Sequence, residues 1–401
     1  MKLAYFGIPH FGGTYTVYRS LKAGLLPLGI EVRWLGVSES SCLTIDPAIW
    51  ADELPSGELV TDNFRTDASL ANAMNAHIEK NYDGVFVTIL GSRIQTNAIR
   101  YLNPRIKRIM IVHTPSPGTL SAARAVAEYV HATVAVSERT CNELVSSYDI
   151  DPASTFCIPN AIELDRYRRV KRVEAAPGQL RILSFGRIEE AAKGVYWIPK
   201  ILAQLKDVNF TLTVAGDGPD RVNLEQRLRP YGSRVTFMGR VPEADIPGLY
   251  AAHDIFLMPS RMEGFGQTLV EAMAAGCVPV ASLINGVTNM IVSHGEDGLL
   301  FKMGRCREAA MGIEKLAADH EQLSAMSHAA RQNVSGRFDL ATQAAAYAGV
   351  IQRVMTAPPP IADPLPFNRW FYPRGLRPGL RTYLPEPVKN LLRTWKERVA
   401  A

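Results

Sequence analysis

The feature that most constrains the fold is an alternation of short apolar runs with longer helical patterns, which runs through the chain twice. The runs 85–90 and Ile109–Val112 are apolar at successive positions, so both faces of each strand should be buried. Strands of that kind belong to parallel sheets covered by helices on both sides. Two successive series of this type predict an α/β fold with two doubly wound, Rossmann-like domains.

The first series contains expected strands near Lys2–Phe6, Glu31–Leu35, Gly84–Ile89, Ile106–His113 and Ala132–Val136. Its expected helices lie near Thr16–Leu28, Ala68–Glu79, Ile94–Tyr101, Thr119–Tyr129 and Glu138–Ser147. The second series has expected strands near Arg181–Phe185, Phe210–Ala215, Val235–Met238, Ile255–Leu257 and Val278–Ala281. Its expected helices lie near Val195–Lys206, Asp220–Arg229, Ile246–Ala252, Thr268–Ala275 and Arg305–Asp319.

The domain boundaries follow from where this periodicity weakens. Between Asn160 and Leu180, prolines and charged residues replace it, so we predict one domain over residues 1–165 and a second over 166–340. A closing helix over 341–356 should return toward the first domain, and a proline-rich tail occupies 357–401. In twin domains of this kind the ligand-binding strand ends face each other across a cleft.

The composition excludes several classes of protein. With 401 residues, 47% hydrophobic and 21% charged, the chain has the length of two globular domains rather than the composition of a disordered protein. The five cysteines form no CxxC pair and are odd in number, which disfavours a disulfide framework or a zinc site. No signal peptide or long apolar span is recognisable, so we expect a cytoplasmic protein.

The positive charge is concentrated in the tail. Residues 357–401 hold eight basic and three acidic residues, which accounts for the whole net charge of +5. The same tail has nine prolines and six aromatic residues. A neutral body with a basic, aromatic tail argues against general nucleic-acid binding and predicts one local anionic partner surface.

The densest motif is a loop and helix start over residues 259–276. It follows an expected strand, turns on Gly264 and Gly266, and opens a helix whose free N–H groups favour a phosphate. Glu263 and Glu271 are eight residues apart, or roughly 12 Å along a helix axis. That exceeds the separation of about 5–5.5 Å between the carboxylates of a retaining glycosidase. The two glutamates therefore suggest two separate binding roles on one extended ligand.

Two cations follow the first strand of the second series. Arg187 and Lys193 lie six residues apart after Gly186, at the strand end where ligands bind. Together they could neutralise a diphosphate leaving group, the arginine as a fork and the lysine as a point charge. The alternative is that both are solvated surface residues.

Further candidates are glycine turns and one histidine. Gly12 and Gly13 lie between the first strand and the first helix, but they do not form the GxGxxG pattern of a nicotinamide dinucleotide site. The turn Gly216–Pro219 serves equally well as a tight connection. His113 ends a buried strand and should face the cleft, although a single histidine is often structural. No Walker loop, GxSxG motif or metal-ligand spacing is present.

These motifs together resemble the signature of the GT4 family of retaining glycosyltransferases, which have the GT-B fold. The resemblance extends over about residues 1–355 and rests mainly on the two glutamates with Gly264-Phe265-Gly266 between them, and on the cation pair Arg187 and Lys193. It implies transfer of a sugar from a nucleoside-diphosphate sugar to a saccharide, lipid-linked or small-molecule acceptor. Configuration would be retained, without an obligatory metal or other cofactor, as in polysaccharide biosynthesis.

The resemblance also implies residue roles. Arg187 and Lys193 would neutralise the diphosphate, Glu263 would contact the donor sugar, Glu271 would bind the ribose, and His113 would contact the donor sugar or acceptor region. The donor-binding set would comprise Gly12, Gly13, Gly186, Val241, Gly264, Phe265, Gly266, Gln267, Thr268, Leu269 and Glu271, with the backbone N–H groups of Gln267, Thr268 and Leu269 on phosphate or sugar. The first domain would bind the acceptor, with its loops Ser38–Pro47 and Thr61–Asp67 setting acceptor choice.

Three alternatives remain beside the transferase. An epimerase or phosphorylase of the same shape is one, although no lysine is singled out for a pyridoxal cofactor. A non-catalytic sugar-nucleotide-binding or scaffold protein is another, although it would be expected to lack Glu263, Arg187 or Lys193. A nicotinamide-dependent oxidoreductase is the third, and it lacks its fingerprint.

The end of the tail predicts a short amphipathic helix over Glu386–Val399. Its apolar residues follow helical spacing, and these are Val388, Leu391, Leu392, Trp395 and Val399. Such a helix could lie at a membrane surface, and residues 366–401 would then form a peripheral membrane contact. Alternatively it packs on the body of the protein or against a partner chain.

Overall fold

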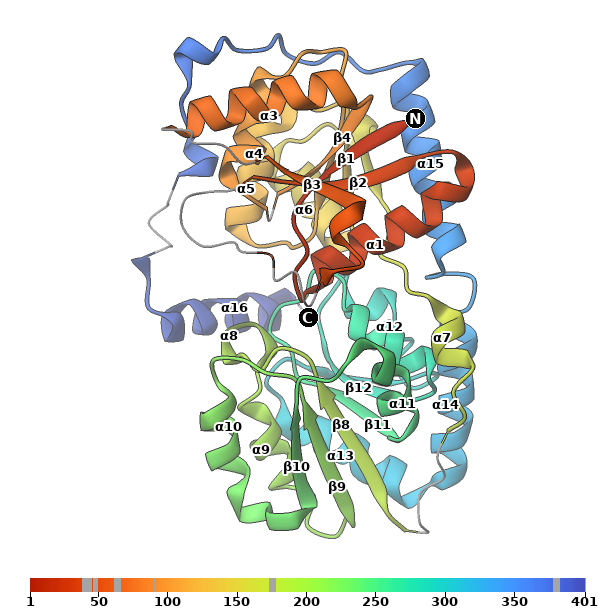
Figure 1. Ribbon diagram of the computed structural model, residues 1–401. Helices are drawn as coiled ribbons and strands as arrows, with labels where there is room; N and C mark the ends of the chain where they lie inside the picture. Colours follow the sequence, from red (N-terminus) through yellow and green to blue (C-terminus); the bar gives the residue numbers. More distant parts are fainter. Residues whose placement is uncertain are drawn as a thin grey trace. The chain divides into compact units, whose positions relative to one another are not determined.

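The computed structural model describes residues 1–37, 45, 50–60, 66–89, 91–172, 178–377 and 383–400. It divides into two compact units, drawn in Figure 1. The N-terminal unit comprises residues 1–161 and 340–382, and the C-terminal unit comprises 162–339 and 383–401. The two loops expected to set acceptor choice, Ser38–Pro47 and Thr61–Asp67, lie almost entirely outside the described residues.

The N-terminal unit is built on a seven-stranded parallel sheet with the order β3-β2-β1-β4-β5-β6-β7. The strands are β1 (Lys2–Phe6), β2 (Glu31–Val37), β3 (Gly57–Val60), β4 (Gly84–Thr88), β5 (Lys107–Val112), β6 (Ala132–Ala135) and β7 (Thr155–Cys157). The helices are α1 (Gly13–Leu25), α3 (Asp67–Asn81), α4 (Arg93–Ala98), α5 (Pro117–Val126), α6 (Glu138–Tyr148) and α15 (Leu340–Thr356). Every residue of β4 is buried, as both of its faces are covered.

The C-terminal unit repeats this plan with a six-stranded parallel sheet in the order β10-β9-β8-β11-β12-β13. The strands are β8 (Leu180–Phe185), β9 (Phe210–Ala215), β10 (Val235–Gly239), β11 (Ile255–Met258), β12 (Val278–Leu283) and β13 (Leu299–Lys302). The helices are α7 (Leu164–Arg168), α8 (Glu190–Lys193), α9 (Trp197–Leu202), α10 (Arg221–Leu228), α11 (Ile246–Ala251), α12 (Gln267–Ala274), α13 (Cys306–Ala318), α14 (His320–Val334) and α16 (Glu386–Ala400). The predicted α/β class with two Rossmann-like halves is confirmed.

The elements that the sequence analysis missed lie mostly at the edges of the sheets. Strands β3, β7 and β13 are three or four residues long, and β3 has no fully buried residue. A short, half-buried strand has neither a long apolar run nor clear alternation, so it carries little pattern to detect. Helix α14 was also missed, because its apolar residues are sparse among polar ones.

The chain passes between the units at three points, and the crossings after Ala161 and after Asp339 are neighbours in the fold. Ile162 forms a parallel bridge with Asp339, and its N–H donates to the carbonyl of Phe338 at 3.0 Å. The division therefore falls at 161/162 and 339/340, a few residues from the predicted 165/166. The closing helix α15 packs on α1 within the N-terminal unit, where Gly24 allows a close approach to Ala344.

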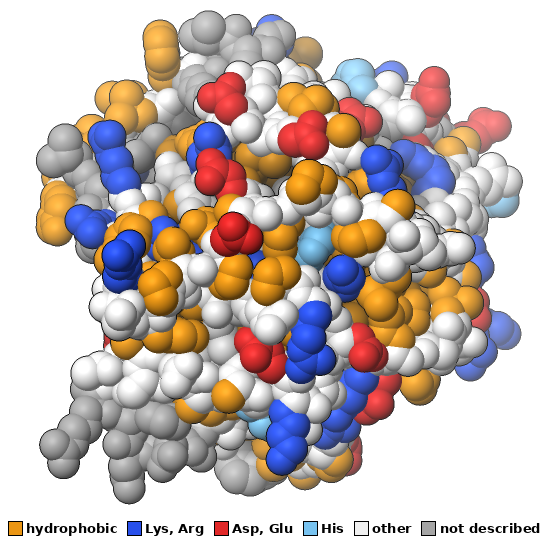
Figure 2. Space-filling view, turned by 90° about the horizontal axis from the view of Figure 1, so that it is seen from above, with side chains coloured by type: hydrophobic (Ala, Val, Ile, Leu, Met, Phe, Trp, Pro, Cys, Tyr) orange, Lys and Arg blue, Asp and Glu red, His pale blue; other side chains and the backbone are white. Residues whose placement is uncertain are grey.

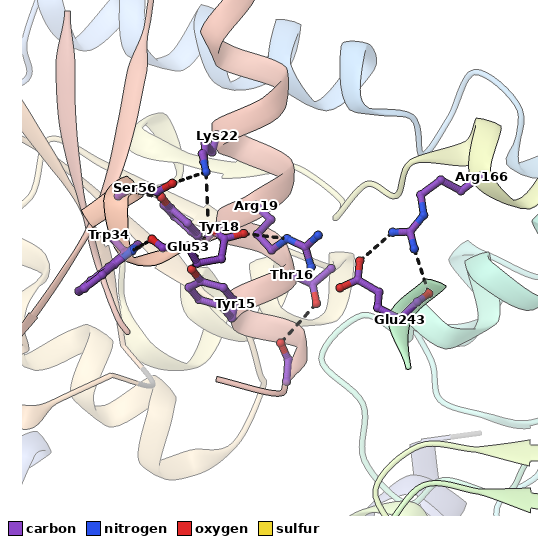
Figure 3. A network of polar contacts seen from close by, with 11 residues as sticks. Tyr15, Thr16, Tyr18, Arg19, Lys22, Trp34, Glu53, Ser56, Arg166 and Glu243 are labelled. Atoms are coloured by element: carbon purple, nitrogen blue, oxygen red, sulfur yellow. Dashed lines mark hydrogen bonds and ion pairs between the residues drawn. The ribbon is translucent and has the colours of Figure 1, made fainter. Parts of the chain in front are cut away.

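A half-buried glutamate, Glu53, connects the segment 50–60 to helix α1 (Figure 3). The carboxylate of Glu53 accepts a hydrogen bond from Tyr15 at 3.1 Å and pairs with Arg19 at 3.3 Å and Lys22 at 3.5 Å. Its backbone carbonyl accepts the indole N–H of Trp34 at 2.8 Å. Four partners from α1 and β2 thus fix the chain just before it enters the edge strand β3.

The tail is divided between the two units. Residues 357–377 cross the N-terminal unit as an aromatic strap, where Phe367 and Trp370 pack on Tyr101 with ring centroids 5.0 and 4.8 Å away. The hydroxyl of Tyr101 donates to the carbonyl of Arg369 and accepts the N–H of Phe371, both at 3.1 Å. On the face of the molecule drawn in Figure 2, basic, acidic and hydrophobic side chains of the described residues are interspersed.

Removing the Tyr101 hydroxyl should loosen this strap. Tyr101→Phe leaves two backbone groups of the strap without their partner, which should lower the free energy of unfolding by about 1–2 kcal/mol. Urea unfolding followed by tryptophan fluorescence measures the change. Tyr383→Phe is the matched control, because that ring is 76% exposed and the substitution should shift the midpoint little.

Candidate active site

A pocket lies in the C-terminal unit at the carboxyl ends of β8, β9 and β11. This is the edge at which open α/β sheets bind ligands. It is lined by Ser184, Phe185, Gly186, Arg187, Ile188, Lys193, Val195, Val214, Ala215, Leu224, Leu257, Met258, Pro259, Ser260 and Thr268. Four of the predicted site residues, Gly186, Arg187, Lys193 and Thr268, therefore share one pocket.

Two glycine turns meet at the mouth of this pocket. Gly216 has a φ of 119°, and a Cβ there would lie 1.9 Å from the carbonyl oxygen of Gly186. A Cβ on Gly218 would lie 2.3 Å from the carbonyl oxygen of Ile188. Only glycine permits this contact, so these residues hold the turns after β8 and β9 together. The Gly216–Pro219 turn thus acts structurally, and it places Arg187 at the pocket.

A third glycine sets Lys193 against the loop that carries Glu263. Gly194 follows α8 with a φ of 60°, and a Cβ there would lie 2.2 Å from the carbonyl oxygen of Pro259. The N–H groups of Arg261 and Met262 both donate to the carbonyl of Ala192, at 2.8 and 3.1 Å. These contacts fix the short helix and the loop as one piece.

Lys193 and Glu263 form an ion pair in which the carboxylate is buried and the lysine is half-buried. Lys193 Nζ lies 2.7 Å from Oε1 of Glu263 and 3.0 Å from Oε2, and Ser260 donates its hydroxyl to Oε1 at 2.6 Å. Glu263 is 8% exposed, and Ser260 is fully buried. A carboxylate buried this deeply needs charged and hydrogen-bonding partners, and here it has both.

Arg187 lies at the same pocket but, unlike Lys193, it is mostly exposed to solvent. Its side chain is 66% exposed, and its Nε is 3.8 Å from a carboxylate oxygen of Glu189. The six-residue spacing thus brings Arg187 and Lys193 to one pocket, as expected. The lysine is engaged with Glu263, whereas the arginine extends into solvent.

The loop after β11 ends in an uncapped helix N-terminus. Gly266, with a φ of 94°, precedes α12 and provides no side-chain cap. As the first two residues of the helix, Gln267 and Thr268 have N–H groups without intrahelical partners. The N–H of Leu269 is already donated to the carbonyl of Gly266 at 2.9 Å, so it is less available than the other two.

Two neighbouring side chains differ in what they offer a ligand. The ring of Phe265 is buried edge-to-face against Phe338, with centroids 5.6 Å apart, so this residue shapes the loop from within the core. The side-chain oxygen of Gln267 is buried without a hydrogen-bond partner among the described residues. Gly264 lies between Glu263 and Phe265 in the same loop.

Glu271 lies one turn after Gln267 in α12, beside two tyrosines. It accepts a hydrogen bond from the hydroxyl of Tyr250 at 3.1 Å. Burial raises the pKa of Glu271 from its ordinary 4.5 to about 7, while hydrogen bonds from Tyr250 and Tyr167 act in the opposite direction. Nearby, Arg166 binds Glu243 at 2.7 Å (Figure 3). Glu271 and Glu263 have separate partners within the protein, and their two separate binding roles on one ligand stay a prediction.

Val241 stands just beyond β10 at the same edge of the sheet. The carbonyl of Gly239, two residues earlier, accepts the N–H of Gly216 at 2.6 Å. The turn after β10 is thereby joined to the turn after β9. The contact of Val241 with the donor base stays a prediction.

The remaining predicted residues belong to the N-terminal unit. Gly12 is the N-cap of α1 and Gly13 its first residue, again without a side-chain cap. His113 follows β5, and burial lowers its pKa to about 4, so the imidazole is neutral at pH 7. Its Nε2 is buried without a partner among the described residues. A neutral imidazole with one unused nitrogen suits hydrogen bonding to a ligand hydroxyl.

Sequence reasoning missed three residues that shape this site. Ser260 precedes Glu263 by three residues, and only the folded loop shows that its hydroxyl reaches the carboxylate. Tyr167 and Tyr250 come from separate helices and meet Glu271 through the tertiary fold. The sequence contains a hint only for Ser260, which is a small polar residue three positions before Glu263.

Comparison with known proteins identifies the fold and shows which family part of the second half resembles. HepE of Anabaena, solved with UDP and glucose, aligns over 88% of this chain and 99% of its own at a TM-score of 0.73 and 19% identity. Residues 179–319 match the family Glycosyl transferases group 1. The chain therefore has the GT-B fold, and residues 179–319 of its C-terminal unit are similar to the group 1 glycosyl transferases. The resemblance drawn from the sequence is confirmed at this level.

Two curated relatives share shorter stretches. The 2-deoxystreptamine glucosyltransferase of Streptomyces kanamyceticus is 29% identical over 221 residues, covering 51% of this chain and 55% of the relative. The phosphatidylinositol N-acetylglucosaminyltransferase gpi3 subunit of Schizosaccharomyces pombe is 32% identical over 162 residues, covering 39% and 35%. The matched part thus spans about a third to a half of the length of these relatives.

The buried ion pair gives a prediction about stability. Lys193→Ala leaves the Glu263 carboxylate buried with Ser260 alone, which should lower the free energy of unfolding by about 1–3 kcal/mol. Arg187→Ala removes an exposed side chain and should change it by less than about 0.5 kcal/mol. Thermal and denaturant unfolding measure both. If the charge is the cause, Lys193→Ala/Glu263→Gln should recover part of the loss, whereas equal effects of the two single variants would contradict the argument.

The raised pKa of Glu271 gives a prediction about pH. Folding favours the protonated carboxyl, so its ionisation costs stability, and this cost develops as pH rises from about 4.5 to 7. Glu271→Gln removes the cost. In the absence of ligand, the variant should gain stability relative to the parent over this range, by about 1–3 kcal/mol, and level off above pH 7. A difference that stays constant from pH 4.5 to 8 would contradict the assigned pKa.

Proposed function

We propose that this protein is a retaining glycosyltransferase that moves a hexose-type sugar from a nucleoside-diphosphate sugar to an acceptor hydroxyl, without a metal. The observation that carries the proposal is the pocket of the C-terminal unit, where two cations and an uncapped helix N-terminus surround one space beside a buried glutamate. This arrangement suits an anionic leaving group joined to a polar sugar. The match of residues 179–319 to a glycosyl transferase family supports it.

Lys193 is positioned to serve two partners at once. Its ammonium group has three hydrogens, and the two oxygens of Glu263 take two of them. The third remains for a phosphate oxygen in the pocket. Glu263 thereby fixes the direction of the lysine, while its carboxylate remains the group proposed to contact the donor sugar.

Arg187 would neutralise the negative charge of the diphosphate together with Lys193. Its side chain is exposed at the pocket, and its contact with Glu189 is long at 3.8 Å, so moving onto a diphosphate would cost little. The N–H groups of Gln267 and Thr268 add fixed partial positive charge at the helix start. Because these groups act on charge that develops as the donor bond breaks, they favour the transition state over the bound donor.

In the proposed step, the bond between the anomeric carbon and the diphosphate oxygen breaks while a bond to the acceptor oxygen forms on the same face. The departing diphosphate oxygen takes the acceptor's proton, so no enzymic nucleophile is required. Glu271 would bind the ribose, Val241 the base through its backbone, and Gly12, Gly13 and His113 would act from the N-terminal unit. In this scheme Arg187, Lys193 and the N–H groups at the start of α12 together take the place of a metal at the leaving diphosphate.

The relatives suggest which donors and acceptors to test first. HepE was solved with UDP, which makes UDP-sugars the first donors to examine. The names of the curated relatives include 2-deoxystreptamine in one case and phosphatidylinositol in the other. Small hydroxylated molecules and lipid-linked acceptors are therefore both to be tested. Among the residues that the structure describes, no helix is long and apolar enough to cross a membrane.

The proposal predicts nucleotide binding and donor turnover. One of UDP, GDP, ADP and dTDP should raise the melting temperature, and the matching sugar donor should be hydrolysed slowly. Arg187→Ala and Glu263→Gln should each lower kcat by about 10²–10³-fold, with the anomeric configuration of the product followed by NMR. Arg229→Ala is the matched control, because this exposed arginine follows α10 at the opposite edge of the sheet.

Two results would overturn it. Stabilisation by a nucleotide without any turnover, unchanged by Glu263→Gln, would favour a sugar-nucleotide-binding scaffold of the same fold. Release of an inverted product would exclude the retaining mechanism while leaving the transferase class in place.

A further inference from the structure

Helix α16 presents its apolar residues to solvent. Val388 is 41% exposed, Leu391 70%, Leu392 44% and Trp395 65%. These residues form the apolar stripe that the sequence predicts, and among the described residues nothing covers them. A terminal helix that served only to complete a core would bury this stripe.

A different side of the helix is anchored to the C-terminal unit. Thr394 is 8% exposed, and its hydroxyl oxygen accepts a hydrogen bond from Arg261 at 2.8 Å. The guanidinium of Arg261 lies over the ring of Trp197, 3.8 Å from its centroid, and also contacts Glu190. Helix α16 thus lies beside α8 (Figure 1), attached through a polar contact with its apolar stripe turned away.

The net charge of residues 383–401 indicates which kind of surface α16 could bind. Residues 383–401 carry four basic and two acidic residues, whereas residues 1–356 are neutral overall. By helical spacing, Lys389 borders the apolar stripe. A net positive segment with a tryptophan within an exposed apolar stripe matches a helix that lies in the interface of an anionic bilayer.

The strap, in contrast, does not belong to this surface. Its aromatic residues Phe367 and Trp370 are engaged with Tyr101, and the hydroxyl of Tyr372 donates to Asp67 at 2.6 Å. The membrane contact expected over residues 366–401 therefore contracts to α16 and the residues just before it. Tyr383, 76% exposed, lies at the start of this segment.

We propose that α16 binds the surface of a bilayer containing anionic lipid, with Val388, Leu391, Leu392 and Trp395 inserted below the headgroups. With 15 residues the helix is about 22 Å long, so it lies along the surface. Because Arg261 connects α16 to the loop that ends in Glu263, membrane binding holds the C-terminal pocket close to the bilayer. This inference stands independently of the catalytic proposal.

The test is flotation of the full chain with lipid vesicles. The parent should float with vesicles of 30% phosphatidylglycerol in phosphatidylcholine, and the bound fraction should fall as salt is added. Leu391→Ser/Trp395→Ser should lower the partition coefficient by at least about tenfold. The matched control is Val222→Ser/Met311→Ser, which removes two exposed apolar side chains elsewhere on the same unit and should float like the parent.

Three outcomes would overturn the proposal. The double α16 variant could float as well as the parent, or the parent could float equally with pure phosphatidylcholine. The third is a parent that does not float but sediments as a dimer, with the α16 variant sedimenting as a monomer, which would assign the stripe to a second copy of the chain. Circular dichroism confirms that each variant is folded. Flotation needs neither nucleotide nor turnover, so its result is separate from that of the donor assays.

Discussion

The ion pair between Lys193 and Glu263 is the interaction on which the candidate site depends. A carboxylate that is 8% exposed is tolerable only with a cation and a hydroxyl in contact, and both come from within the same group of loops. Lys193 is on α8, whereas Ser260 and Glu263 both lie in the loop after β11. Once the pair has formed, the turn after β8 and the loop after β11 cannot move independently, and the pocket between them has defined walls.

That pair is possible because three backbone segments approach more closely than side chains would allow. Gly216 touches the carbonyl of Gly186, and Gly194 touches that of Pro259. Parallel strands bring their carboxyl ends to one edge, and the glycines close the remaining gap. The glycines therefore act here mainly as spacers that allow Lys193 and Glu263 to meet.

Much of this could be predicted from the sequence, and the misses have common causes. The buried strands were found because their apolar runs are unbroken, while edge strands such as β3 were missed because they are short and half-buried. Arg187 and Lys193 were placed at one site by position after a strand end. Their different states were not predictable, since the pairing of Lys193 depends on a loop 70 residues away. The partition of the tail between the two units was missed for the same reason.

The sequence by itself determined the two-series α/β architecture, the strand-end location of the site and the identity of its charged groups. These follow from periodicity and local turn chemistry, which are properties of neighbouring residues. Only the tertiary structure decided which groups touch. The neutral state of His113, the raised pKa of Glu271 and the outward face of α16 all depend on what surrounds a residue. Burial and pairing are set by contacts between distant segments, and a linear pattern does not contain them.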